Sequence, residues 1–202
     1  MATPTGAMHA PVHQDDQKHL LSDRTIMLIK PEEIAADRHK DILAFVEAYC
    51  KNNGLTCTSE RRRFTKEQAE RHFLGRGDDY IKKVGRKTIQ TILERGFTPA
   101  GDEKVMGELM LKMHAKEYTG KDILLVTVTG PDALTLINRI KGSTDPTEAE
   151  PGTVRHQFST GMTLFDSFEK QIPLRNIVHV PVDIEELSYD TQTFPPASFL
   201  RQ

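Results

Sequence analysis

The stretch from Gly142 to His179 constrains this chain most strongly, because it gathers residue types that suit an anion. Turns of small residues open the stretch, one at 142–146 (GSTDP) and one at 151–153 (PGT). Such turns leave backbone N–H groups and hydroxyls free to face a negatively charged ligand. Arg155 follows the second turn, and His179 lies in an otherwise apolar run. Amide, hydroxyl, guanidinium and imidazole groups together predict a phosphate-binding site.

Taken singly, each of these residues also has an ordinary structural interpretation. A histidine in a valine-rich strand, such as His179, is more often a core residue with a satisfied hydrogen bond. Thr144 and Gly152 are common turn residues, and a lysine at a strand end, such as Lys30, is usually solvated. The prediction therefore depends on these residues occurring together and in this order.

The combined pattern resembles the active-site stretch of nucleoside diphosphate kinases. It is carried by residues 29–31 (IKP), by 142–155 with its GSTDP and EPGTVR segments, and by 176–179 (NIVH). The resemblance extends over residues 24–189. It implies an enzyme that transfers the γ-phosphate of a nucleoside triphosphate to a nucleoside diphosphate through a phosphohistidine intermediate, with ping-pong kinetics.

The resemblance also implies a role for each matching residue. His179 corresponds to the catalytic nucleophile, which must be neutral imidazole with one ring nitrogen free. Lys30 corresponds to a lysine that contacts the sugar hydroxyl and the phosphates, and Thr144 and Arg155 correspond to further phosphate contacts. Asn176 corresponds to the asparagine that binds the sugar. Mg²⁺ is expected to arrive with the nucleotide, bound mainly by phosphates and water rather than by protein ligands.

The base of the nucleotide is expected to stack on an aromatic side chain at the rim of the site. Phe73, Tyr80 and Phe97 are the candidates, and the sequence does not rank them. Phe73 also stands where the family has a tyrosine that touches the nucleophile, so the hydroxyl of that tyrosine is missing here.

Other positions also differ from the family pattern. Asn138 stands where the family has an arginine, and Arg139 is one step along the predicted helix, about 100° away. Residues 180–182 (VPV) replace a Gly or Ala followed by Ser. The carboxylate that orients the histidine has no certain counterpart, and direct counting falls on Asp190, with Glu185 and Glu186 closer. These differences leave open a second function, a nucleotide-binding or regulatory protein with weak or no phosphotransfer.

Hydrophobic periodicity predicts the order strand, helix, strand, helices, strand, helix, strand. Strands are expected at 25–29, 55–64, 122–129 and 176–182, and helices at 39–52, 65–73, 80–93 and 105–118, with another that ends at Gly142. This order predicts an α+β fold. The resemblance likewise implies a ferredoxin-like antiparallel sheet (β-α-β-β-α-β), with helices on one face and an extra helical insertion.

Composition sets the remaining expectations. Residues 1–22 lack periodicity and predict a disordered tail. Residues 23–202 are expected to form a single domain with insertions at 74–105 and 156–175. These insertions resemble those of the long bacterial and archaeal-type members of the nucleoside diphosphate kinase family. With 27 basic and 29 acidic residues, the net charge of -2 gives no support for nucleic-acid or membrane binding. Two cysteines and no long apolar run favour a reduced, cytoplasmic protein. The resemblance, rather than composition, implies the expected partners, which are nucleoside di- and triphosphates and further copies of the chain in a hexamer.

Overall fold

The computed structural model describes residues 22–197 and 199. The tail predicted at 1–22 therefore lies outside the described residues, apart from Ser22. None of the helices in the described part of the chain combines the length and the apolar character needed to cross a membrane. The thiols of Cys50 and Cys57 are both free.

The described strands form one antiparallel sheet, in the order β2-β3-β1-β4. The strands are β1 (Arg24–Ile29), β2 (Thr56–Arg63), β3 (Asp122–Thr129) and β4 (Val178–His179). In this register Leu28 of β1 lies opposite Leu125 on one side and His179 on the other. The predicted α+β, ferredoxin-like class is confirmed, and the register fixes His179 at the end of the sheet where β1 also ends.

The helices predicted at 39–52, 65–73, 80–93 and 105–118 and the one predicted to end at Gly142 all occur, with boundaries within a few residues of those expected. The described helices are α2 (Pro31–Ala35), α3 (His39–Asn52), α4 (Lys66–Leu74), α5 (Asp78–Glu94), α6 (Glu103–Tyr118), α7 (Ala133–Lys141), α8 (Val154–Gln157), α9 (Leu164–Glu169) and α10 (Ile184–Thr193), with a 3₁₀ turn η1 (Pro146–Glu148). Of these, α2, α8, α9 and α10 were not predicted. Helix α4 begins where the sequence predicts it, because Thr65 and Gln68 form a capping box.

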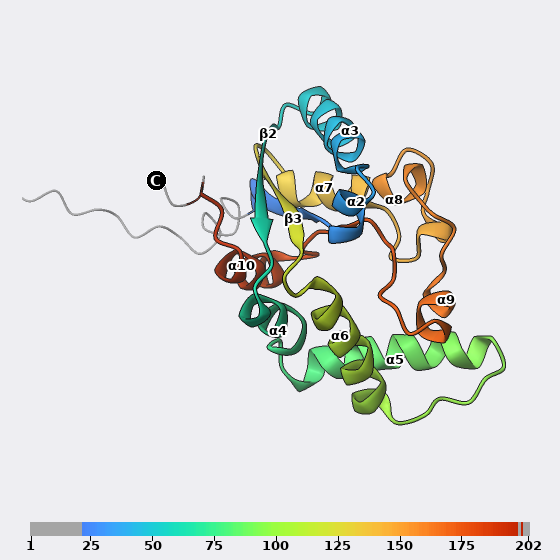
Figure 1. The fold of residues 1–202 in the computed structure, drawn as a ribbon. Helices are drawn as coiled ribbons and strands as arrows, with labels where there is room; N and C mark the ends of the chain where they lie inside the picture. Colours follow the sequence, from blue (N-terminus) through green and yellow to red (C-terminus); the bar gives the residue numbers. More distant parts are fainter. Residues whose placement is uncertain (1–21, 198, 200–202) are drawn as a thin grey trace, which may run out of the picture.

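Helices cover both faces of the sheet, so the expectation that they pack on one face is wrong (Figure 1). Met27 and Ile29 of β1 pack with α3 and α7, whereas Ile26 and Leu28 pack with α4, α6 and α10. Alternate side chains of a strand point to opposite faces. Because β1 is buried from Thr25 to Ile29, both of its faces must pack against other elements.

Helices α5 and α6 form a hairpin in which their backbones touch. A Cβ atom at Gly85 would lie 1.7 Å from the carbonyl oxygen of Glu103, and one at Gly107 would lie 2.0 Å from that of Ile81. Neither glycine can be replaced without separating the two helices, so these contacts fix where α5 lies. The segment 156–175 packs against α3, since Phe158 meets Phe45 edge-on at 5.8 Å.

The strand predicted at 176–182 is much shorter, because only Val178 and His179 pair with β1. Ile177 before them has a φ of 68°, in the left-handed region that β-branched residues rarely adopt, and Pro181 after them has no N–H to donate. Helix α10 follows and was not predicted. It begins at the N-cap Asp183, whose carboxylate accepts from the backbone N–H of Glu186 at 2.8 Å.

Candidate active site

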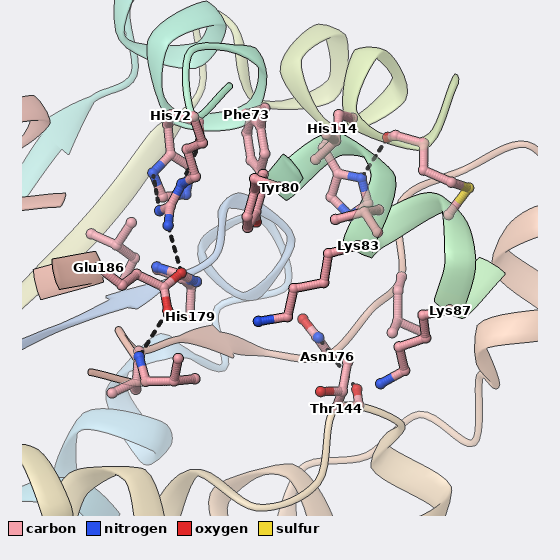
Figure 2. Close-up of a pocket in the computed structure, with 18 of the residues that line it drawn as sticks. His72, Phe73, Tyr80, Lys83, Lys87, His114, Thr144, Asn176, His179 and Glu186 are labelled. Carbon is pink, nitrogen blue, oxygen red and sulfur yellow. Dashed lines mark hydrogen bonds and ion pairs between the residues drawn. The ribbon is translucent and has the colours of Figure 1, made fainter. Parts of the chain in front are cut away.

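A cavity of about 770 Å³ lies where the α5–α6 hairpin faces the ends of β1 and β4 (Figure 2). Helices α4, α5 and α6 form one wall, and the 174–182 segment with α10 forms the other. All the residues predicted for the site line this cavity, namely Lys30, Phe73, Thr144, Arg155, Asn176 and His179. The fold thus brings together residues that are spread over most of the chain.

His179 is held by a carboxylate from α10. Its Nε2 lies 2.6 Å from Oδ2 of Asp190, and its side chain is 23% exposed whereas that of Asp190 is fully buried. Of the carboxylates left open by the sequence, Asp190 is therefore the one that contacts the ring. A helical pattern could have pointed to it, because Asp183, Glu186 and Asp190 recur on one face of α10.

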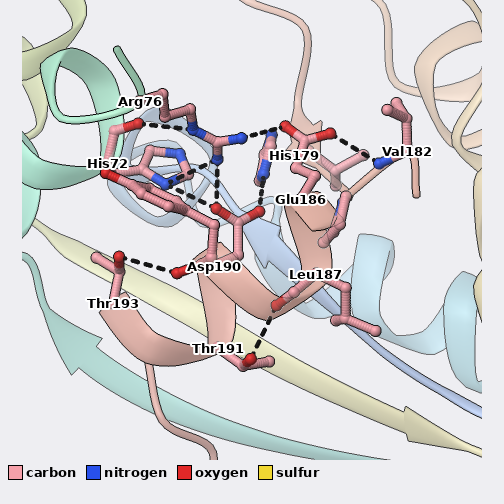
Figure 3. A network of polar contacts seen from close by, with 12 residues as sticks. His72, Arg76, His179, Val182, Glu186, Leu187, Asp190, Thr191 and Thr193 are labelled. Atoms are coloured by element: carbon pink, nitrogen blue, oxygen red, sulfur yellow. Dashed lines mark hydrogen bonds and ion pairs between the residues drawn. The ribbon is translucent and has the colours of Figure 1, made fainter. Parts of the chain in front are cut away.

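Asp190 also contacts two residues that the sequence did not single out (Figure 3). His72 of α4 places Nδ1 3.1 Å from Oδ1 of Asp190, and Arg76 bonds the same oxygen through Nη2. Arg76 also bonds Glu186 at 2.6 Å. Burial of Asp190 opposes its ionisation, but His179 and His72 outweigh it and hold the pKa of Asp190 well below its usual range. Asp190 is therefore an ionised acceptor.

An ionised carboxylate can only accept hydrogen bonds, so the hydrogen of the neutral His179 ring is on Nε2. The other nitrogen, Nδ1, then carries a lone pair, and within the described residues it has no hydrogen-bond partner. Burial lowers the pKa of His72 to about 4, which leaves its ring neutral as well. The arrangement can present one imidazole lone pair as a nucleophile.

The described residues contain one group of side chains with metal-ligand spacing, His72, His179 and Asp190, whose ligand atoms lie within 4.8 Å of one another. Two of these ligands are nitrogens, and the guanidinium of Arg76 already neutralises the carboxylate. Mg²⁺ prefers oxygen ligands in octahedral geometry. The cluster is therefore suited to holding the His179 ring and unsuited to Mg²⁺.

Lys30 is only 5% exposed and lies at the end of β1. Its Nζ donates to the carbonyl oxygen of Leu174 at 3.1 Å, which leaves other N–H groups for a ligand. Burial lowers the pKa of Lys30 to about 8, so its charge is costly in the unliganded cavity. An anion bound beside it would compensate that cost.

Arg155 is almost entirely committed to the backbone. Its Nε donates to the carbonyl of Asn176 at 3.0 Å and its Nη2 to that of Val178 at 2.8 Å. Its Nη1 donates to the carbonyls of Gly142 and Ser143 at 3.1 and 2.9 Å. One N–H therefore remains for a ligand, as far as the described residues show. Arg155 fastens the small-residue turn to the segment that carries His179.

Asn176 and Thr144 lie next to each other where the small-residue turn meets the segment that carries His179. The Nδ2 of Asn176 donates to the backbone oxygen of Thr144 at 3.3 Å. The Oδ1 of Asn176 is buried and has no partner within the described part of the chain. A buried acceptor of this kind costs free energy unless a donor reaches it, and a ligand hydroxyl would satisfy it.

The aromatic candidates differ in how available their rings are. Phe73 is 8% exposed and its ring packs against Phe64 and Tyr118, so it is part of the wall. Tyr80 lines the cavity and is partly exposed. Phe97 does not line the cavity and packs on Phe165 at 5.3 Å.

Arg139 does not take the place of the arginine that the family has at the position of Asn138, because Arg139 is exposed and lies outside the cavity. Asn138 instead donates to the carbonyl oxygen of Pro181 at 2.6 Å and accepts from Nζ of Lys141 at 2.6 Å. Lys141 lines the cavity, and burial lowers its pKa to about 8. Sequence reasoning missed Lys141, because its approach to the site depends on where α7 ends.

Comparison with known proteins places the chain in a family. A nucleoside diphosphate kinase of Methanocaldococcus jannaschii is 30% identical over 109 residues, which are 45% of this chain and 75% of that protein. One of Pyrobaculum aerophilum is 23% identical over 163 residues, 78% of this chain and 86% of that protein.

The fold agrees with these relatives, although no family model matches the sequence. The crystal structure of an NDP kinase from Pyrobaculum aerophilum has a TM-score of 0.77 at 20% identity, and the match covers 87% of this chain and 97% of that one. The chain belongs to the nucleoside diphosphate kinase family.

Proposed function

We propose that the protein is a working nucleoside diphosphate kinase, which transfers the γ-phosphate of a nucleoside triphosphate to a nucleoside diphosphate through phosphorylated His179. The observation that carries the proposal is the 2.6 Å bond from His179 Nε2 to Asp190, at the edge of a cavity with buried cations. The names of the relatives support the same activity.

In the first half-reaction, the lone pair on Nδ1 of His179 attacks the γ-phosphorus of the triphosphate. The bond between that phosphorus and the β-γ bridging oxygen breaks, and the nucleoside diphosphate leaves with the electron pair. Phosphorylation makes the ring cationic while Nε2 keeps its hydrogen, and the Asp190 carboxylate offsets the charge. A terminal phosphate oxygen of the acceptor diphosphate then attacks the phosphorus, and Nδ1 recovers its lone pair.

The cavity supports this chemistry by neutralising phosphate charge. Lys30 and Lys141 line it, and both have a pKa lowered to about 8 by burial. A bound polyphosphate would hold both lysines in the charged form and would gain from their low-dielectric surroundings. Asn176 is expected to accept from a sugar hydroxyl through its unpartnered Oδ1. Thr144 and the remaining N–H of Arg155 are the further expected phosphate contacts.

We expect Mg²⁺ to accompany the nucleotide. The side-chain cluster at Asp190 does not suit Mg²⁺, because it offers imidazole nitrogens and already contacts Arg76. Mg²⁺ commonly keeps several waters and binds through substrate phosphates, where it neutralises charge. We also expect assembly into a homo-oligomer, a hexamer by family resemblance, which light scattering on the purified protein would test.

The direct test is to incubate the protein with ATP labelled at the γ-phosphate and to look for acid-labile phosphate on the chain. The native protein should become labelled and should lose the label on addition of any nucleoside diphosphate. His179→Ala should abolish labelling. His156→Ala is the matched control, since His156 is exposed and does not line the cavity. Label that survives His179→Ala would place the chemistry at another residue.

The alternative is a nucleotide-binding or regulatory protein on the same fold. The segment Val180-Pro181-Val182 favours it, because Pro181 has no N–H and the N–H of Val182 is committed to Glu186 at 2.8 Å. Neither residue therefore offers a backbone donor to a phosphoryl group. Nucleotide binding without any labelling of the native chain would support this alternative and would contradict the kinase.

A further inference from the structure

Helix α5 carries two lysines that face the cavity from the side opposite His179 (Figure 2). Lys83 and Lys87 are four residues apart and therefore lie on the same face of the helix. Both side chains are exposed, and both line the cavity. Neither ammonium group makes a hydrogen bond or an ion pair with any other described residue.

The other charges of α5 behave differently. Arg86, which does not line the cavity, binds Glu103 at 2.9 and 3.0 Å. Asp78 binds Lys104 at 3.0 Å. Asp79, one turn before Lys83, lines the cavity but has no ion pair within the described residues. The lysines that face the cavity are thus free to bind an anion, whereas Arg86 is held by a protein carboxylate.

The arginines that line the cavity have few N–H groups left to bind a phosphate. Arg76 is taken by Asp190 and Glu186, and Arg155 gives most of its donors to backbone carbonyls. A nucleoside diphosphate or triphosphate carries several negative charges along its phosphate chain. Lys30 and Lys141 alone would leave part of that charge uncompensated.

Two buried polar atoms in the same cavity also point to a ligand. The hydroxyl of Tyr118 and the Oδ1 of Asn176 have no hydrogen-bond partner within the described residues, and the two side chains are 3% and 9% exposed. Both residues line the cavity together with Lys83 and Lys87. Buried polar atoms normally find partners, so a polar ligand in this cavity accounts for both of them.

We propose that Lys83 and Lys87 bind the phosphate chain of the nucleotide, so that the inserted helix α5 forms one side of the phosphate site. This inference rests on the proposed function, and it assigns to α5 part of the charge that the resemblance assigns to Arg155. The close contact of Gly85 with α6 fixes the helix segment that carries both lysines. Each ammonium donates to phosphate oxygens as a flexible point charge.

The test is calorimetric titration of the full chain with ADP, AMP and adenosine at fixed Mg²⁺, without any phosphate donor. Lys83→Ala/Lys87→Ala should weaken ADP binding about 10-fold and AMP binding less, because exposed charge pairs contribute modestly. Adenosine binding should not change, and Lys83→Arg/Lys87→Arg should retain most of the ADP affinity. The affinity for ADP should also fall less steeply with added salt in the double alanine variant.

Lys82→Ala is the matched control, because Lys82 is exposed on the same helix and does not line the cavity. It should bind ADP within about twofold of the native chain. Equal ADP affinity in the double alanine variant and the native chain would overturn the inference and leave the kinase proposal standing. A native chain that binds no ADP would overturn both the inference and the kinase proposal. Labelling with ATP tests the kinase proposal independently.

Discussion

Asp190 of α10 lies 2.6 Å from the ring of His179, although the two residues belong to different elements and to opposite sides of Pro181. Asp190 is also bound by His72 of α4 and by Arg76, which comes just after α4. The carboxylate therefore joins three parts of the chain and determines which nitrogen of His179 is free. The proposed phosphotransfer depends most directly on this bond.

Replacing Asp190 by asparagine should slow labelling of His179 by about 10²–10⁴-fold, because the ring loses the partner that fixes its tautomer. Nucleotide affinity should change much less, since Asp190 does not line the cavity. Single-turnover labelling with ATP would measure the rate. Glu186→Gln also breaks an ion pair of Arg76 but spares His179, so it should have a smaller effect. Equal losses in the two variants would contradict an orienting role.

Affinity for ADP should fall as pH rises from 7 to 9, by about 10- to 100-fold. The pKa values of Lys30 and Lys141 are both lowered to about 8, so the free protein loses these charges across that range. Bound phosphate favours the charged forms, and binding near pH 8 should therefore take up protons. Calorimetry in buffers of different ionisation enthalpy measures this uptake, and Lys141→Met should reduce it. Binding that releases protons would contradict the prediction.

Arg155→Lys should lower the free energy of unfolding by about 2–4 kcal/mol, because several backbone carbonyls lose their donor. A lysine keeps the charge but cannot reproduce the planar fork. Urea unfolding would measure the loss, with the exposed Arg139→Lys as the control. If Arg155→Lys raised the KM for nucleotide without lowering stability, Arg155 would be mainly a phosphate contact.

Gly85→Ala should destabilise the protein by about 2 kcal/mol or more, although alanine has a higher helix propensity than glycine. The added methyl would meet the backbone oxygen of Glu103 at 1.7 Å, and backbone cannot move aside as a side chain can. Thermal unfolding would measure the effect against Lys82→Ala on the same helix. Because α5 would shift, ADP affinity should fall as well. A variant as stable as the native chain would show that the two helices are not tightly packed.

Several elements could be predicted from the sequence because their causes are local. The apolar run of β1, the periodic helix at His39–Asn52 and the capping box of Thr65 all depend on neighbours a few residues away. The co-occurrence of the small-residue turns with His179 likewise indicated the family from the order of residues alone. Helix α10 escaped prediction because its apolar positions are few and its buried face carries Asp190.

Only the tertiary structure decided which charges face the cavity that we propose as the nucleotide site. The sequence suggested that Arg155 contacts phosphate, yet its donors meet carbonyls that packing brings within 3.1 Å. It offered no reason to choose Lys83, Lys87 or Lys141 among the basic residues of the chain. Periodicity identifies which face of a helix is buried, but the partner of a polar side chain depends on how distant elements pack. That packing is set by the whole core and is not written in any short stretch of sequence.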